Sequence, residues 1–217
     1  LKFANGLIDL SNGILLLTLF FTMVASIILG MGSPTTANYI ITSTMAAPAI
    51  ILLLTDGGAN EITTTVLLSA HMFAFYFGIV ADITPPVALA AFAACGISRG
   101  KPIRTGFEAS KLAIAAFLIP YIFVLSPQLF LIDTTFMEGL FVITTSLIGM
   151  AAIGSAITGY LFRPMNAVER ILGGVGGLML IYPEGFSDVI GATVLAVLFI
   201  LQFVKVKKNN ATPKVAN

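Results

Sequence analysis

Charged side chains are scarce in this 217-residue chain. It contains 11 Lys+Arg and 10 Asp+Glu, so only 10% of its residues are charged, whereas soluble domains average about 25%. Hydrophobic residues make up 58% of the sequence, and the mean hydropathy is +1.02. So few charges cannot cover the surface of a soluble globule of this size, and a chain this apolar would not stay disordered in water. The composition therefore predicts an all-α polytopic membrane protein.

Side chains that bind metals or act as nucleophiles are also few. Cys95 is the one cysteine and His71 the one histidine. A lone cysteine excludes an intrachain disulfide and a cysteine metal cluster, and a single histidine excludes the H-E-x-x-H zinc motif. The sequence has no P-loop, and nothing orients Cys95 and His71 as a nucleophile–base pair. We therefore predict that the chain is not an enzyme and needs no cofactor. The net charge of +1 gives no reason to expect nucleic acid as a partner.

Apolar runs separated by polar breaks predict the membrane segments. A helix that spans the bilayer needs roughly 20 apolar residues. The run 167–182 is short and rich in glycine, which predicts close helix packing. The polar tail 205–217 is predicted to be disordered. The apolar runs are 13–31, 37–54, 63–97 (with a break at 82–86), 112–131, 137–162, 167–182 and 187–204.

The distribution of charge predicts the orientation of these segments. If 63–97 is one broken crossing, one side of the membrane holds almost all of the basic residues, and the opposite side holds only Lys2. This positive-inside pattern places the C-terminus in the cytoplasm. Splitting 63–97 into two crossings would separate the basic residues of 98–111 from those of 163–170, so we reject that alternative. The basic residues on the one side are Arg99, Lys101, Arg104, Lys111, Arg163, Arg170, Lys205, Lys207, Lys208 and Lys214.

The first break falls between the runs 13–31 and 37–54. Pro34 has no N–H, so the carbonyl of Gly30 should lose its helical partner. A helix that starts near Thr35 would direct its N-terminal dipole and free N–H groups toward an anion. We interpret the break as the tip of a re-entrant hairpin that contacts ligand; the alternative is a tight turn between two ordinary spans. The candidate binding residues are Gly30, Gly32, Ser33, Pro34, Thr35, Thr36 and Asn38. Pro48 is a further weak point in the second arm.

The second break is the sequence Asp82-Ile83-Thr84-Pro85-Pro86. Two adjacent prolines remove the N–H groups that would bond the carbonyls of Ala81 and Asp82. Free carbonyls and the Thr84 hydroxyl are hard oxygen ligands, so Ala81, Asp82 and Thr84 are predicted to hold Na⁺. Asp82 is an acidic residue inside an apolar run, so it is also a candidate proton carrier. The alternative is that Asp82 caps the following half-helix.

His71, Tyr39 and Tyr76 are weaker candidates. His71 precedes Asp82 by about three helical turns, so the two side chains lie roughly 16 Å apart along one helix and cannot touch. A lone histidine is more often a packing residue than a proton relay. The two tyrosines are candidates for contact with substrate, although aromatic residues in apolar helices mostly pack.

Three stretches carry a resemblance to a known family. They are GMGSPTTANYIITSTMAAPAI at 30–50, AHMFAFYFGIVADITPPVALAAFAACGI at 70–97, and GKPIRTGFEASKLAIAAFLIPYIFV at 100–124. All three resemble the fused membrane permease of TRAP (tripartite ATP-independent periplasmic) transporters, in the TAXI-associated subgroup. The last part, about 136–204, resembles the extra C-terminal membrane region of such permeases.

The resemblance implies an elevator-type secondary transporter of the bacterial inner membrane. Relatives take up carboxylate-bearing solutes by symport with Na⁺ or H⁺, and a periplasmic solute-binding protein delivers the solute. The chain begins at Leu1 without an initiator methionine, and the first repeat of the family is absent. We therefore expect a C-terminal fragment that supplies half of the fold and half of the binding site. The alternative is an ion-coupled carrier or a channel-like protein of an unrelated family.

The resemblance also implies a domain organisation. Residues 1–131 would be the C-terminal part of the transport domain, with the hairpin at 13–54, the broken helix at 63–97 and a further helix at 112–131. Residues 132–204 would be an accessory transmembrane region, and 205–217 a cytoplasmic tail.

Overall fold

The computed structural model describes residues 2–132, 134–182 and 185–211, and the side chains among them up to residue 204. The chain divides into two compact units, Leu1–Thr134 and Thr135–Asn217. Apart from one isolated bridge between Tyr160 and Pro164, the regular structure of the described residues is helical. The predicted all-α class is therefore confirmed.

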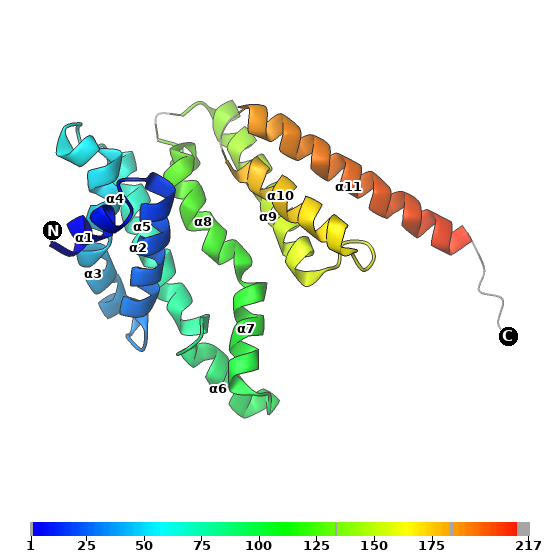
Figure 1. Ribbon diagram of the computed structural model, residues 1–217, viewed down its shortest axis with the longest axis horizontal. Helices are drawn as coiled ribbons and strands as arrows, with labels where there is room; N and C mark the ends of the chain where they lie inside the picture. The colour runs from blue at the N-terminus through cyan, green and yellow to red at the C-terminus, as the bar shows by residue number, and fades with distance from the viewer. Residues whose placement is uncertain (1, 133, 183–184, 212–217) are drawn as a thin grey trace. The chain divides into compact units, whose positions relative to one another are not determined.

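The first unit begins with a short helix and a hairpin of apolar helices (Figure 1). The helices are α1 (Lys2–Leu10), α2 (Leu15–Gly30), α3 (Thr35–Met45) and α4 (Ala47–Leu54). The second arm is interrupted at Ala46, two residues before Pro48. Since Pro48 cannot donate a backbone hydrogen bond, it forms the predicted weak point between α3 and α4.

The predicted broken helix follows, after a 3-10 turn, η1 (Asp56–Gly58). The Thr63 hydroxyl accepts the Val66 N–H and caps α5 (Thr64–Val80). A 3-10 turn, η2 (Ala81–Ile83), ends this half, and α6 (Leu89–Ser98) begins after the cis Pro85–Pro86 bond.

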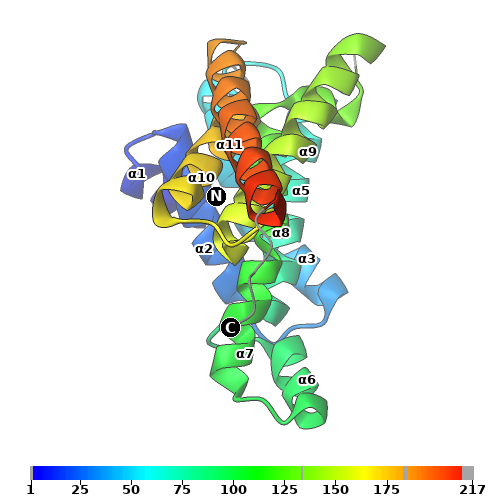
Figure 2. The same ribbon diagram turned by 90° about the vertical axis from the view of Figure 1, so that its right-hand side faces the viewer.

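The next segment differs from the sequence-based expectation. Residues 98–111 were expected to be a loop before a span at 112–131. Instead α7 (Pro102–Leu112) occupies most of that loop, α8 (Ile114–Leu125) is shorter, and η3 (Pro127–Phe130) follows. Proline is favoured in the first helical turn because it has no N–H to leave unpaired there. α6 and α7 lie side by side at one end of the unit in both views (Figures 1 and 2).

α5 is the central helix of the first unit and contacts α2, α3, α4 and α8. Its buried face carries Phe73 and Phe77, whose ring centroids are 4.8 Å apart. Tyr121 of α8 packs edge-on against both rings. Leu19 of α2 and Ile50 of α4 complete this fully buried apolar core.

The second unit is built from α9 (Phe136–Thr158), α10 (Ala167–Ile181) and α11 (Gly185–Ala211). The predicted close packing of the glycine-rich helix is confirmed at Gly177. A Cβ atom there would lie 2.6 Å from the Gly149 carbonyl oxygen of α9. The prediction of a disordered tail is wrong for residues 205–211, because α11 continues to Ala211. The rest of the tail lies outside the described residues.

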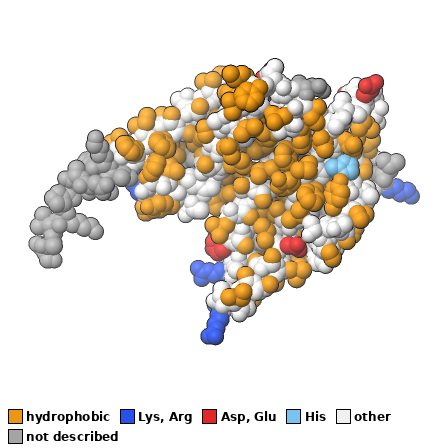
Figure 3. All heavy atoms as spheres, turned by 180° about the vertical axis from the view of Figure 1, so that it is seen from behind, with side chains coloured by type: hydrophobic (Ala, Val, Ile, Leu, Met, Phe, Trp, Pro, Cys, Tyr) orange, Lys and Arg blue, Asp and Glu red, His pale blue; other side chains and the backbone are white. Residues whose placement is uncertain are grey.

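Several of the described segments are long and apolar enough to cross a membrane. They are Thr35–Leu54, Thr64–Ile83, Phe136–Thr158 and Gly185–Val204, with α7 and α8 as a further candidate if this pair, bent by 44°, is one span. Hydrophobic side chains predominate on the face shown in Figure 3. A lipid environment accommodates such a surface, so the polytopic membrane class is confirmed.

Candidate functional site

The two predicted breaks lie next to each other in the first unit. α2 ends at Gly30 and α5 ends at Val80, and α2 also contacts η2. The approach is very close, because a Cβ atom on Gly30 would lie 2.7 Å from the carbonyl oxygen of Gly78. Two helix C-termini, the start of α3 and the 82–88 segment therefore meet in one region, and the tertiary structure alone creates this meeting.

Asn38 joins the two breaks. Its side chain is 1% exposed, and its Nδ2 donates to the carbonyl oxygens of Gly78 at 2.5 Å and Gly30 at 3.5 Å. A Cβ atom on Gly30 or on Gly78 would lie 2.7 Å from the Asn38 amide, so both glycines are needed to admit it. Among the described residues, Asn38 Oδ1 is buried without a hydrogen-bond partner. A buried, unsatisfied amide oxygen beside two carbonyls is a position suited to a cation.

Gly32 lies in the turn that joins α2 and α3, and its backbone has a conformation that glycine favours. Gly32 has φ +75°, which a glycine adopts without strain, and no described atom lies within 4 Å of its Cβ position. The turn geometry, rather than a close neighbour, accounts for this glycine. Ser33 is half-buried, whereas Pro34, Thr35 and Thr36 are exposed at the start of α3. The N–H groups of this first turn have no helical acceptor and stay available to a ligand.

The second break differs in part from its predicted chemistry. The Ala81 carbonyl accepts the Thr84 N–H at 3.2 Å, so the expectation that it lacks a donor is wrong. The Thr84 hydroxyl donates to the Val80 carbonyl at 2.7 Å, which leaves its oxygen lone pairs available. The alternative in which Asp82 caps the next half-helix is also wrong, because α6 starts at Leu89 and has Ala88 as its N-cap. In the described part of the chain, no hydrogen bond or ion pair involves the Asp82 carboxylate.

α7 covers the second break, and this contact was not predicted from the sequence. The Ser110 hydroxyl lies 3.1 Å from the Ile83 carbonyl and donates to it. Gly106 is buried, and a Cβ atom there would lie 3.1 Å from Pro85 Cγ and 3.3 Å from Ala88 Cβ. The sequence signal for this helix was Pro102 followed by the small residues Gly106 and Ser110 at intervals of four. The surrounding charged residues made the segment resemble a loop.

His71 does not stand alone in the structure. Its Nδ1 lies 3.0 Å from the Tyr39 hydroxyl, so the pair links α3 to α5. Tyr39 also packs edge-on against Phe75, at 5.4 Å between ring centroids. Tyr76 packs against the ring of Phe123. These contacts favour a packing role for all three candidates.

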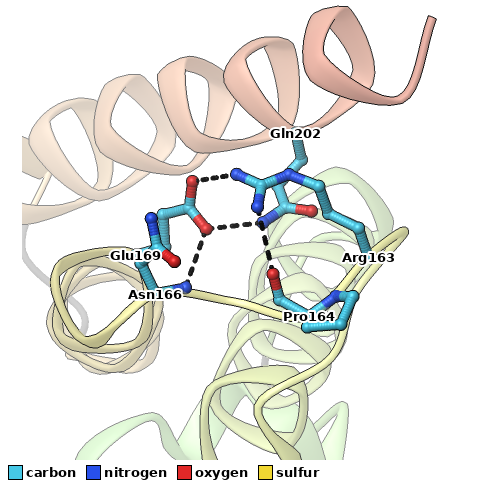
Figure 4. A network of polar contacts seen from close by, with 5 residues as sticks. All are labelled: Arg163, Pro164, Asn166, Glu169 and Gln202. Carbon is cyan, nitrogen blue, oxygen red and sulfur yellow. Dashed lines mark hydrogen bonds and ion pairs between the residues drawn. The ribbon is translucent and has the colours of Figure 1, made fainter. Parts of the chain in front are cut away.

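A second polar cluster lies in the second unit (Figure 4). The Glu169 carboxylate forms an ion pair with Arg163 and accepts the Asn166 N–H at 3.0 Å and Gln202 Nε2 at 2.8 Å. Asn166 and Glu169 form a capping box at the start of α10, while Gln202 reaches across from α11. The N-x-x-E spacing at 166–169 and a glutamine inside an apolar run were the available sequence signals.

Helices that are interrupted inside an apolar bundle, with their ends meeting around buried polar groups, define a polytopic membrane protein of the transporter type. The family described as "Tripartite ATP-independent periplasmic transporter, DctM component" matches residues 1–137, and the chain belongs to this family. Comparison with curated proteins and with solved structures gave no match. The match ends close to the boundary between the two compact units, at Thr134.

Proposed function

We propose that this chain forms part of a permease that couples uptake of carboxylate-type solutes to an ion gradient, Na⁺ or H⁺. The observation that carries the proposal is the meeting of the C-termini of α2 and α5 with the N-terminal turns of α3 around buried Asn38. α2 and α5 end there, and α3 begins there. Helix C-termini present carbonyl groups that attract cations, and N-termini present N–H groups that attract carboxylates.

The cation site that we propose has two neighbouring sets of oxygens. One set is the carbonyls of Gly30 and Gly78 with the Asn38 Oδ1. The Gly78 carbonyl oxygen and the Asn38 Oδ1 lie 2.7 Å and 3.0 Å from the position that a Gly30 Cβ would fill, and Asn38 Oδ1 has no hydrogen-bond partner among the described residues. The other set is the one predicted from sequence, at Ala81, Asp82 and Thr84. Hard oxygen ligands of this kind suit Na⁺, and Asp82 is the group that would carry a proton instead.

Membership of this family is the basis on which we propose partners and a membrane location for the chain. A periplasmic solute-binding protein, for which we propose the TAXI type, would deliver the solute to the outer side. We propose that the remaining half of the binding site comes from another part of the permease. We propose that the protein lies in the bacterial inner membrane, as the resemblance implies, and that its C-terminus is cytoplasmic, because the predicted topology puts most basic residues on one side.

Thermal unfolding of the purified permease in Na⁺ or in choline at equal ionic strength tests the cation site. The single cysteine of this chain, Cys95, is buried, so a thiol-reactive dye reports its exposure on unfolding. A bound cation stabilises the folded state according to its concentration and affinity. Na⁺ should therefore raise the melting temperature above its value in choline.

Thr84→Val removes one candidate oxygen, and Thr44→Val is its matched control. Both threonine hydroxyls donate to the carbonyl four residues earlier at 2.7 Å, but Thr44 is exposed on α3. We expect Thr84→Val to weaken Na⁺ affinity by about tenfold, equivalent to about 1.4 kcal/mol, while Thr44→Val leaves it unchanged. Asn38→Asp should also alter the ion dependence. If Thr84→Val and Asn38→Asp both bind Na⁺ like the parent protein, the coupling site lies elsewhere in the permease.

A further inference from the structure

The outer face of α7 combines exposed apolar side chains with basic ones. Ile103 is 65% exposed and Phe107 is 56% exposed, so neither of these large apolar side chains belongs to the core. Arg104 and Lys111 share this face at helical spacing, and Lys101 precedes the helix. We call these five residues the α7 surface. A soluble protein would bury such apolar groups, whereas a helix at a membrane interface exposes both kinds.

The charge of this segment is strongly one-sided. Residues 99–112 contain four basic residues and one acidic residue, a net charge of +3 in a chain whose total is +1. Glu108 forms an exposed ion pair with Lys111, at 3.0 Å between Nζ and Oε1. Within the described residues, Arg99, Lys101 and Arg104 have no acidic partner. This part of the surface therefore carries an excess of positive charge, which attracts anions.

A hollow of about 570 Å³ lies on this face. Basic and apolar side chains both line it, together with Glu108, so a ligand that has a charged group and a hydrocarbon chain can contact side chains of both kinds. In Figure 3 blue basic side chains gather at the end of the molecule formed by α6 and α7. The residues that line the hollow are Lys101, Pro102, Ile103, Arg104, Phe107, Glu108 and Lys111.

We propose that the α7 surface binds an anionic phospholipid of the cytoplasmic leaflet. Lys101 and Arg104 would contact the phosphate of the headgroup, and an acyl chain would lie along Ile103 and Phe107. The positive-inside distribution places this segment at the cytoplasmic side, where basic residues near the surface attract anionic lipids. A water-soluble anion would match the charges but would leave the apolar residues exposed, so a lipid fits both features.

The opposite face of α7 packs against the second break, so α7 lies between the bound lipid and that break. Ser110 donates to the Ile83 carbonyl, and Gly106 packs against Pro85 and Ala88. A lipid held on one side of α7 therefore lies one helix away from the 82–88 break. Binding at the α7 surface holds α7 against that break and links its position to the composition of the membrane.

Fluorescence quenching by brominated lipids tests the proposal directly. The chain contains no tryptophan, so Phe107→Trp places a single reporter in the hollow. The variant is reconstituted in phosphatidylcholine vesicles that contain either brominated phosphatidylglycerol or an equal fraction of brominated phosphatidylcholine. We expect stronger quenching by the anionic lipid. Each basic residue that contacts the headgroup should raise the affinity for phosphatidylglycerol over phosphatidylcholine by about fivefold.

Charge-removing variants in the Phe107→Trp background separate a specific site from general attraction. Lys101→Gln with Arg104→Gln should abolish the preference, because the headgroup loses both cations. Lys2→Gln removes an exposed basic residue that is distant from α7 in the sequence, and it should leave the preference for the anionic lipid unchanged. Equal quenching by the two lipids, or a preference that survives the double substitution, would overturn the proposal. Weak quenching by both lipids would also overturn it, because protein rather than lipid would then cover α7.

Discussion

Asn38 shows how a single side chain can connect two distant segments of a membrane protein. It lies 40 positions before Gly78 in the sequence, yet its amide donates to the Gly78 carbonyl. The contact exists because Gly30 and Gly78 both lack a side chain at the point of closest approach. In hydrocarbon an unsatisfied amide is costly, and this cost is the reason why we propose the partly satisfied Asn38 as part of a cation site.

Gly30→Ala should destabilise the first unit by about 1–3 kcal/mol, as overpacking typically does. The added Cβ would meet the Gly78 carbonyl at 2.7 Å, and a backbone atom cannot move aside without shifting α5. Gly96→Ala is the matched control, because no described atom lies within 4 Å of its Cβ position in α6. That variant should be neutral or more stable by about 0.5–1 kcal/mol. Thermal unfolding in detergent, followed by circular dichroism, compares them, and equal melting temperatures would contradict the close approach of α2 and α5.

At the scale of elements, polar residues determine how α11 attaches to the other helices of its unit. α9 and α10 meet through the backbone near Gly149 and Gly177, and apolar contact alone can hold such a pair. α11 additionally places Gln202, which is fully buried, against the Glu169 carboxylate at the start of α10. This hydrogen bond helps to orient α11 about its axis, together with the Ser187 hydroxyl, which donates to the Met179 carbonyl of α10, and the close approach of Gly191 to Gly176.

Gln202→Leu should therefore lower the stability of the second unit by about 1–3 kcal/mol, because the Glu169 carboxylate loses one charge-assisted hydrogen bond while it keeps Arg163 and the Asn166 N–H. Thr193→Val on the same helix is the control. Its hydroxyl is exposed and donates only to the Val189 carbonyl of α11 itself. Loss of helical circular dichroism on heating in detergent measures both variants. If Gln202→Leu melts with the parent protein, the contact with Glu169 does not hold α11 in place.

At the scale of the whole molecule, the family match and the division into units nearly coincide. The match covers residues 1–137, and the first unit ends at Thr134. The helices α9, α10 and α11 lie almost entirely beyond the matched residues. Their apolar surfaces and span-like lengths nevertheless indicate that the second unit is also embedded in the membrane.

Labelling of single cysteines tests the orientation of both units. In a Cys95→Ala background, a cysteine at Asn60, in the exposed connection before α5, should react with a membrane-impermeant maleimide from the periplasm. Cysteines at Ser98 and Tyr160 should react only after permeabilisation, because both positions flank the basic segments. The reverse pattern would show that the C-terminus is periplasmic and would move the α7 surface to the other leaflet.

Local chemistry explains which features could be predicted from the sequence. Pro34, Pro48, Pro85 and Pro86 lack an N–H, and the breaks between α2 and α3, α3 and α4, and α5 and α6 lie at or near these positions. Pro120, by contrast, lies inside α8, and the break between α7 and α8 falls at Ala113. α7 was missed because its charges and its single buried glycine, Gly106, resemble a loop; only packing against Pro85 and Ala88 reveals its inner face. The helical extension of α11 was missed for a similar reason, since lysine and asparagine are common in polar tails.

The sequence by itself determined that this is a helical membrane protein with two interrupted segments. Hydropathy and proline content act locally along the chain, so no tertiary information is needed to read them. Only the tertiary structure decided that the two interruptions meet, because that contact depends on Gly30 and Gly78 facing each other across separate helices. It also decided that Asn38 bridges them and that the Ala81 carbonyl bonds to the Thr84 N–H. Hydrogen bonds and close packing of this kind are set by distances in space, which the order of residues does not specify.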